Sequence, residues 1–143
     1  MKSITILSTM LILGLQLPMT TVLAEVAIIA NPASGAGELD SKTAKKLFLG
    51  KIKTTPGMSS ITLVGQADNS PVKAEFTKKV TKKDLSKYKA HWSKMIFSGK
   101  AIPPKVLAND EAVKAYVANH NDAVGYVDAG AVDDSVKILL RAP

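Results

Sequence analysis

A continuous apolar run, Val26-Ala27-Ile28-Ile29-Ala30, is the segment that most constrains the fold of this chain. A short run without alternation is typical of a strand that is buried on both faces. Asn31-Pro32 ends the strand, because proline cannot donate a hydrogen bond to a ladder. The sequence therefore predicts a central strand in a sheet that other elements cover on both sides.

Helical patterns and further apolar runs alternate after this strand. Four helices are predicted, each from a capping residue and apolar residues at helical spacing; they begin at Asp40, at Ser70-Pro71, at Asp84 and at Asn109 or Asp110. Three more strands are predicted from short apolar runs at residues 61–64, 123–127 and 136–140. Strands that alternate with helices predict an α/β fold with a mixed sheet.

The connections are predicted from their turn-forming residues. Residues 99–105 contain Pro103-Pro104 and are expected to form a loop. Asp133, Asp134 and Ser135 are typical of a hairpin turn between the two closing strands. The tail after residue 140 is expected to be frayed.

The first 24 residues have the pattern of a secretory signal. Lys2 supplies the positive start, residues 4–17 are largely apolar, and Val22-Leu23-Ala24 resembles a cleavage site. Pro18 interrupts the apolar run before it reaches the ~20 residues of a membrane span, which disfavours a transmembrane anchor. We therefore expect a signal peptide at residues 1–24, a single domain at residues 25–143, and a periplasmic or secreted location.

The composition excludes several classes of function. The chain has no cysteine, so disulfides, thiolate metal sites and a cysteine nucleophile are excluded. Its net charge is +7, but Arg141 is the only arginine, which is unusual for a protein that reads nucleic acid. His91 and His120 show no metal-ligand spacing with acidic residues. No nucleophile–base pair or phosphate loop is present, so we predict no enzymatic activity, no metal, no cofactor and no nucleic-acid partner.

Several phrases in the chain resemble a known family. Residues 48–52, Phe-Leu-Gly-Lys-Ile, close a predicted helix, and residues 125–127, Gly-Tyr-Val, lie in a predicted strand. Together with the turn at residues 66–72, they resemble one lobe of the phosphate-type periplasmic binding proteins, which serve ABC importers. Residues 92–100 also resemble small secreted proteins that consist of this lobe alone. The resemblance implies a single periplasmic-binding-protein-like lobe, with a mixed β-sheet flanked by helices on both faces.

The turn at residues 66–72 corresponds to the place where the family holds its anion. The family pattern is Arg-x-Asp-Gly-Ser-Gly-Thr, and Asp68 and Ser70 match its aspartate and serine. The resemblance implies that Asp68 accepts a proton from a protonated phosphate oxygen and that Ser70 donates its hydroxyl. Asn69 and the amides of Val72 and Lys73 would complete a site at a helix N-terminus, where unpaired N–H groups attract anions.

Three residues depart from the family pattern. Gln66 replaces the arginine, Pro71 replaces a glycine and removes an N–H group, and Val72 replaces a threonine and its hydroxyl. Each donor lost to a buried anion costs about 1.5–3 kcal/mol, so the departures predict weaker binding. The alternative is that Ser70 and Pro71 only begin a helix, which explains the same local pattern.

A second loop, after the first strand, is also a candidate for ligand binding. Asn31 and Ser34 follow that strand, and we expect them to face the same crevice as Ser70, because ligands of open α/β sheets gather at strand ends. An ordinary connecting loop is the alternative. The predicted ligand is a small oxyanion, phosphate first, with a membrane transporter or sensor protein as a further partner. Because 119 residues leave no room for a second lobe, the protein could form a homodimer, or could be an interaction or sensory module of the cell envelope that has lost ligand binding.

Overall fold

A computed structural model describes residues 14, 16 and 25–143 of the chain. The predicted signal segment therefore lies almost entirely outside the described residues. Five strands and four helices follow one another, with a short 3₁₀ turn before the last strand. Their bounds are β1 Val26–Ala30, α1 Ser41–Phe48, β2 Thr62–Gln66, α2 Pro71–Lys79, α3 Leu85–Phe97, β3 Lys105–Leu107, α4 Asp110–Ala118, β4 Ala123–Asp128, η1 Ala129–Ala131 and β5 Lys137–Ala142.

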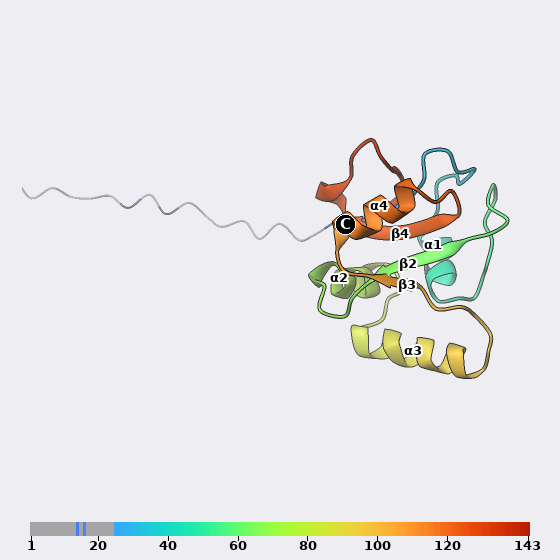
Figure 1. The fold of residues 1–143 in the computed structure, drawn as a ribbon. Coiled ribbons are helices and arrows are strands. Elements are labelled where there is room, and N and C mark those ends of the chain that lie inside the picture. Colours follow the sequence, from blue (N-terminus) through green and yellow to red (C-terminus); the bar gives the residue numbers. More distant parts are fainter. Residues whose placement is uncertain (1–13, 15, 17–24) are drawn as a thin grey trace, which may run out of the picture.

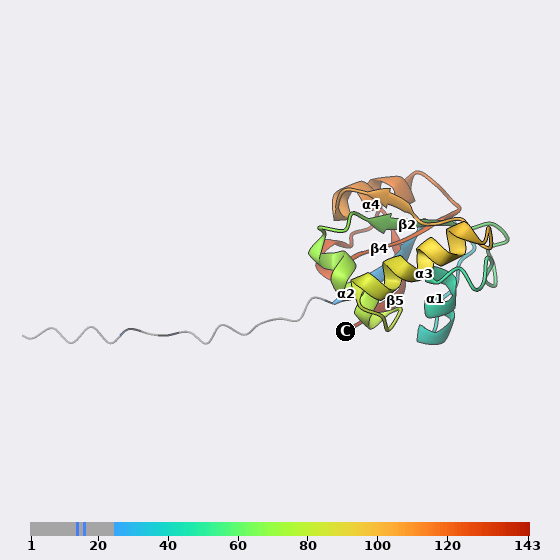
Figure 2. The same ribbon diagram turned by 90° about the horizontal axis from the view of Figure 1, so that it is seen from below.

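The strands form one mixed sheet in the order β3-β2-β4-β1-β5. β2 runs parallel to β3 and to β4, whereas β1 runs antiparallel to both of its neighbours, β4 and β5. Helices α1, α2 and α3 cover one face of the sheet, and α4 covers the other (Figures 1 and 2). The predicted α/β fold, with a mixed sheet between helices, is confirmed.

The strand β1 belongs to both cores of the molecule, as its apolar sequence predicted. All five of its residues have 0% exposure. Val26, Ile28 and Ala30 face the core under α1, α2 and α3, while Ala27 and Ile29 face the smaller core under α4. This alternation is the period of a strand whose two faces are both buried.

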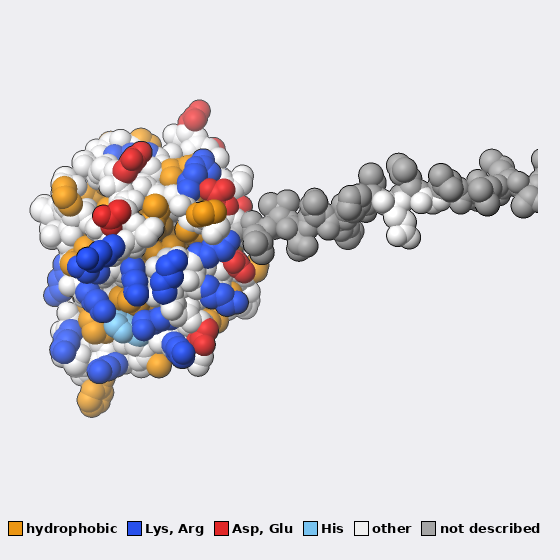
Figure 3. Space-filling view, turned by 180° about the vertical axis from the view of Figure 1, so that it is seen from behind, with side chains coloured by type: hydrophobic (Ala, Val, Ile, Leu, Met, Phe, Trp, Pro, Cys, Tyr) orange, Lys and Arg blue, Asp and Glu red, His pale blue; other side chains and the backbone are white. Residues whose placement is uncertain are grey.

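Lysines occupy the outward surfaces of the helices. Lys42 and Lys46 of α1, and Lys87, Lys89 and Lys94 of α3, are exposed. Figure 3 shows Lys and Arg side chains gathered over the lower half of the molecule, the half in which α3 lies. Among the described residues, no helix is both long enough and apolar enough to cross a membrane.

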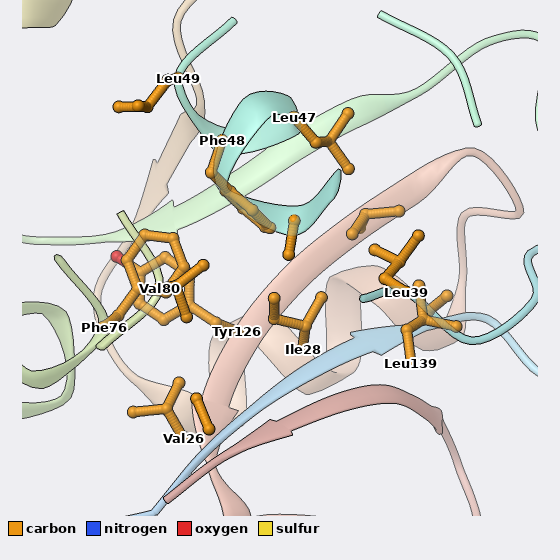
Figure 4. Close-up of a cluster of buried hydrophobic side chains, with 14 of the residues drawn as sticks. Val26, Ile28, Leu39, Leu47, Phe48, Leu49, Phe76, Val80, Tyr126 and Leu139 are labelled. Carbon is orange, nitrogen blue, oxygen red and sulfur yellow. The ribbon is translucent and has the colours of Figure 1, made fainter. Parts of the chain in front are cut away.

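Aromatic contacts join the larger core to the sheet. The rings of Phe76 and Tyr126 stack with centroids 3.7 Å apart, and Phe48 meets Phe76 edge-on with centroids 4.8 Å apart. Figure 4 shows the stacked pair beside Phe48, with Ile28 and Val26 of β1 nearby. Because Phe76 and Phe48 are both fully buried, they anchor α2 and α1 to the same part of the sheet.

Two predictions about the connections are wrong, and a third is confirmed except for its last residue. The expected loop is present at residues 99–104, but Lys105 already begins β3, a strand of three residues that is too short to show a period in the sequence. Asp133 and Ser135 do form a turn, but β4 and β5 are no hairpin, because both pair with β1 instead of with each other. The tail is not frayed at residue 140, because β5 continues to Ala142, which pairs with Val26.

The aromatic core gives a test of the fold. Replacing Phe76 by alanine should lower the free energy of unfolding by about 3–5 kcal/mol, because it removes a fully buried ring and leaves a cavity. The matched control is Phe97→Ala, since Phe97 is 96% exposed and should change stability by less than about 0.5 kcal/mol. Urea unfolding followed by circular dichroism measures both variants, and equal losses would contradict this account of the core.

Candidate functional site

The turn at residues 67–70 connects β2 to α2 and lies beside the end of β3. The Ala67 N–H donates to the Leu107 carbonyl at 2.9 Å, and the Ser70 N–H donates to the Ala67 carbonyl at 2.9 Å. Pro71 then begins α2, where its fixed φ suits the first helical position. These bonds hold the turn at the carboxyl ends of two parallel strands, the edge of the sheet where such folds place ligands.

Gln66, which stands where the family has arginine, is a buried hub of this turn. Its side chain is 1% exposed, and its Nε2 donates to Asp110 Oδ1 at 2.7 Å and to the Tyr126 carbonyl at 3.1 Å. Its Oε1 accepts a hydrogen bond from Ser70 Oγ at 2.6 Å. The Gln66 backbone N–H donates to the Tyr126 hydroxyl oxygen at 3.0 Å. Gln66, the last residue of β2, is therefore bonded to β4, to α4 and to Ser70, the N-cap residue of α2.

Ser70 occupies the N-cap of α2, as predicted, but its side chain makes no capping hydrogen bond. The hydroxyl donates to Gln66 instead, and the residue is only 9% exposed. The expectation that its side chain caps the helix is therefore wrong. A buried amide oxygen needs a donor, and the Ser70 hydroxyl is placed to supply it.

Asp68 binds two lysines at the surface of the turn. Lys73 Nζ lies 2.7 Å from Asp68 Oδ1, and Lys89 Nζ lies 2.6 Å from Asp68 Oδ2. The hydrogen bond from Lys73, followed by the one from Lys89, lowers the pKa of Asp68 to about 2. The carboxylate is therefore ionised at neutral pH, and each of its oxygens carries one charged partner.

Lys73 is the most enclosed charge of the site. Its side chain is 10% exposed, while the side chain of Lys89 is 55% exposed. The Lys73 ammonium also lies 5.8 Å from the centre of the Tyr88 ring, which places it near an aromatic face. A small open hollow of about 190 Å³ adjoins both lysines, with Trp92 and Pro104 among its walls.

Asn31 and Ser34 lie at the opposite edge of the sheet from Ser70, so the prediction of a shared crevice is wrong. β1 runs antiparallel to β4, and β4 runs parallel to β2, so the end of β1 lies away from the end of β2. The Asn31 amide donates to the carbonyls of Val117 and Ala118 at 3.1 and 2.9 Å, at the end of α4. Asn31 therefore caps the C-terminus of α4, at the opposite end of the strands from Ser70.

Lys89 is the residue of this site that the sequence did not reveal. It comes from α3, 21 positions after Asp68, and no spacing rule connects two residues of separate elements. The network around Gln66 was equally hidden, because Asp110 and Tyr126 belong to α4 and β4. Tyr126 is 1% exposed and also belongs to the larger core.

No group of three or more His, Cys, Asp or Glu residues in the described chain could hold a metal ion. The charged donors that converge on the turn are the ammonium groups of Lys73 and Lys89, which meet the carboxylate of Asp68. Such a set can bind an anion through charge-assisted hydrogen bonds. The Lys73 N–H, which was predicted to face the anion, donates to the Ser70 carbonyl at 3.2 Å.

Comparison with known proteins identifies the fold. No protein-family model matches the chain, and a search of curated proteins finds no match either. Among solved structures, a protein described as a phosphate ABC transporter substrate-binding protein of Clostridium perfringens, with bound phosphate, matches 81% of this chain with a TM-score of 0.64 and 21% identity. An ABC-type phosphate transport receptor from Vibrio cholerae matches 81% of the chain with a TM-score of 0.64 and 20% identity.

PstS from Borrelia burgdorferi also matches, over 83% of this chain, with a TM-score of 0.62 and 14% identity. This chain spans 45%, 47% and 48% of the lengths of the three structures, respectively. The fold is that of one periplasmic-binding-protein-like lobe. At these identities the likeness establishes the fold, and the resemblance to phosphate-binding proteins at the level of fold is confirmed.

The charge state of Asp68 can be measured directly. Because its folded pKa is depressed to about 2, below the ordinary value of 3.8, its ion pairs stabilise the fold above about pH 4 and are lost as the pH falls towards 2. A carbon-detected NMR titration should show Asp68 titrating well below the ordinary aspartate value of 3.8. Lys89→Gln should raise this pKa, whereas Lys46→Gln on α1 should leave it unchanged. An ordinary pKa for Asp68 in the parent protein would refute the paired geometry.

Proposed function

We propose that this protein is an exported, non-enzymatic binding domain that recognises phosphate or a similar small oxyanion beside the N-terminus of α2. Asp68, Asn69, Ser70, Val72 and Lys73 are its proposed ligand-binding residues, as in the sequence analysis, and Lys89 joins them. Asn31 and Ser34 are left out, because they lie at the other edge of the sheet.

The observation that carries this proposal is the convergence of Lys73 and Lys89 on one carboxylate. Two ammonium groups face the single negative charge of Asp68, so the three groups together carry a net charge of +1. Lys73 is largely enclosed, and electrostatic attraction is stronger where water is excluded. Asp110 is the other carboxylate of the turn, and it is engaged by Gln66 and by the Asp128 N–H.

The proposed mechanism combines electrostatic attraction with selection for an anion that carries a proton. The two lysines attract the anion, and the first turn of α2 offers the N–H of Val72. Asp68 is ionised, so it can accept a hydrogen bond from a protonated oxyanion such as hydrogen phosphate, and it repels sulfate, which carries no proton. The Ser70 hydroxyl donates to Gln66, so its contact with the anion requires it to rotate away from that amide.

The assembly around the site is also proposed. The similar structures are about twice as long as this chain, so the chain offers one lobe against the ligand. A homodimer that brings two α2 turns together would enclose the anion from both sides. A membrane transporter or sensor of the envelope is the proposed recipient of the loaded protein.

A second candidate function is protein interaction without a ligand. It is favoured because the buried polar groups of the turn are already hydrogen-bonded within the protein. No buried side-chain nitrogen or oxygen among the described residues lacks a hydrogen-bond partner. In this view Gln66, which replaces a charged arginine, has made the turn a purely structural unit. The two functions differ in whether a folded protein binds an oxyanion.

Isothermal titration with phosphate, with sulfate as the comparison, tests the proposal. Phosphate should bind more tightly than sulfate, and Lys73→Gln should weaken phosphate binding about 10- to 100-fold, because one charge-assisted hydrogen bond contributes about 1.5–3 kcal/mol. Asp68→Asn should reduce the preference for phosphate over sulfate.

The control is Lys46→Gln, which removes a positive charge from exposed α1 and should leave both affinities within about twofold of the parent, since screened distant charges contribute little. A protein that is shown to be folded by circular dichroism, and that gives no heat with either anion, would reject anion binding and leave the second candidate. Equal weakening in Lys46→Gln and Lys73→Gln would mean that the anion binds to the general positive charge of the surface.

A further inference from the structure

The large hydrophobic side chains that are exposed gather in one short segment of the described chain. They are Ile96, Phe97, Ile102 and Val106, with exposures of 52%, 96%, 87% and 61%. All four fall between residues 96 and 106, from the end of α3 to β3, while the other described elements bury their large apolar residues. Isolated exposed apolar residues are ordinary, but a concentration of this kind marks a surface that meets an apolar partner.

These residues form one continuous surface, which we call the apolar corner. Ile96 and Val106 line the same small hollow together with Pro103, and Ile102 lines a larger adjoining hollow, which also includes Pro103. Phe97 is the last residue of α3 and adjoins Ile96. Figure 1 shows the chain leaving α3 and turning back along the molecule to β3.

The apolar corner projects from the body of the protein. Gly99 has a positive φ of 67°, which turns the chain sharply after α3, and a Cβ placed on it would meet nothing within 4 Å. Phe97 at 96% exposure is almost completely surrounded by solvent. The corner is therefore convex at its tip, with aromatic and aliphatic side chains at its most exposed points.

All the charged residues in the segment that contains the apolar corner are lysines. Residues 85–109 contain no Asp or Glu, and they contain the lysines Lys87, Lys89, Lys94, Lys100 and Lys105. Lys94, Lys100 and Lys105 form no salt bridge in the described chain. Lys105 lies with its ammonium 5.4 Å from the centre of the Tyr116 ring, at the inner margin of the corner.

We propose that the apolar corner binds the surface of an anionic lipid bilayer. Aromatic and aliphatic side chains enter the boundary between headgroups and acyl chains, and the flanking lysines contact the anionic headgroups. The long lysine side chains can extend to the headgroups while their stems lie along the apolar surface. This binding is peripheral and uses other residues than the proposed oxyanion site, although Ile96 and Val106 line the same hollow as Lys73.

The shape and the edge of the sheet favour lipid over a protein strand. β3 is an edge strand, but it has three residues and is preceded by Pro103-Pro104, and short edge strands with proline and lysine resist pairing with another chain. A protein partner would also need a pocket shaped to receive Phe97, whereas lipid chains adapt to any protruding side chain. A second copy of this chain would bring one lysine-rich corner against another, which like charge disfavours.

Co-sedimentation with lipid vesicles tests the proposal on the chain from Glu25, which avoids the apolar segment at residues 1–24. This chain retains both cores, since every core residue lies between Val26 and Ala142. Binding should be at least about tenfold tighter to vesicles that contain one-third phosphatidylglycerol than to phosphatidylcholine alone, and it should fall as salt screens the lysines.

Variants of the apolar corner separate the apolar and electrostatic parts. Phe97→Ser with Ile102→Ser should weaken binding at least about tenfold, whereas Phe97→Leu should retain most of it, because leucine keeps an apolar side chain at the tip. Lys94→Gln with Lys100→Gln should weaken binding by about 25-fold, since each lysine near an anionic surface contributes about fivefold. All of these residues are exposed, so the variants should fold as the parent does.

Lys46→Gln is the matched control. It removes one positive charge from the exposed surface of α1, outside the corner, so binding to vesicles should stay within about twofold. The proposal is overturned if neutral and anionic vesicles bind equally, if the serine variant binds as tightly as the parent, or if vesicles do not bind at all. Concentration-dependent dimerisation that the serine variant abolishes, without vesicle binding, would assign the corner to a second copy of the chain instead.

Discussion

The burial of β1 on both faces and along both edges is the constraint on which the rest of the structure depends. Its residues have no exposed surface, and they supply apolar side chains to both cores. β1 also reverses direction relative to β4, so the loop after it emerges at the edge of the sheet opposite to the ends of β2 and β4. The loop that follows β1 therefore does not lie beside the polar turn before α2.

That turn is built from two sets of polar groups with different surroundings. The inner set, around Gln66, is buried and fully bonded, and it joins Ser70 to strands and helices that are distant in sequence. The outer set, Asp68 with Lys73 and Lys89, is charged and partly open to solvent. Buried amides hold geometry because leaving them unpaired is costly, whereas surface ion pairs can exchange partners at little cost. The inner set therefore positions the turn, and the outer set supplies the lysines of the proposed anion site.

Helix α3 connects this turn with the apolar corner. Its N-terminal half sends Lys89 to Asp68 and buries Tyr88 and Trp92 against the larger core, while its last residue, Phe97, stands in solvent. The indole N–H of Trp92 donates to the Phe48 carbonyl at 3.1 Å and fixes the helix to the end of α1. One helix thus presents a charged residue to the turn and an apolar tip to solvent, and the hollow between them is lined by residues of both.

The α/β class, the central strand, the four helices and the position of the turn before α2 could all be predicted from the sequence, because they follow from local periodicity, capping residues and turn residues. The direction and the pairing of the strands could not, because they depend on long-range contacts. The three-residue β3 shows no periodic pattern in the sequence. β5 pairs with β1 and not with β4, and this choice is set by long-range pairing. The same holds for the site: Asp68, Ser70 and Lys73 are neighbours in sequence, whereas Lys89, Asp110 and Tyr126 reach the turn from separate elements. The separation of Asn31 from Ser70 was likewise decided by the antiparallel course of β1, which no local pattern encodes.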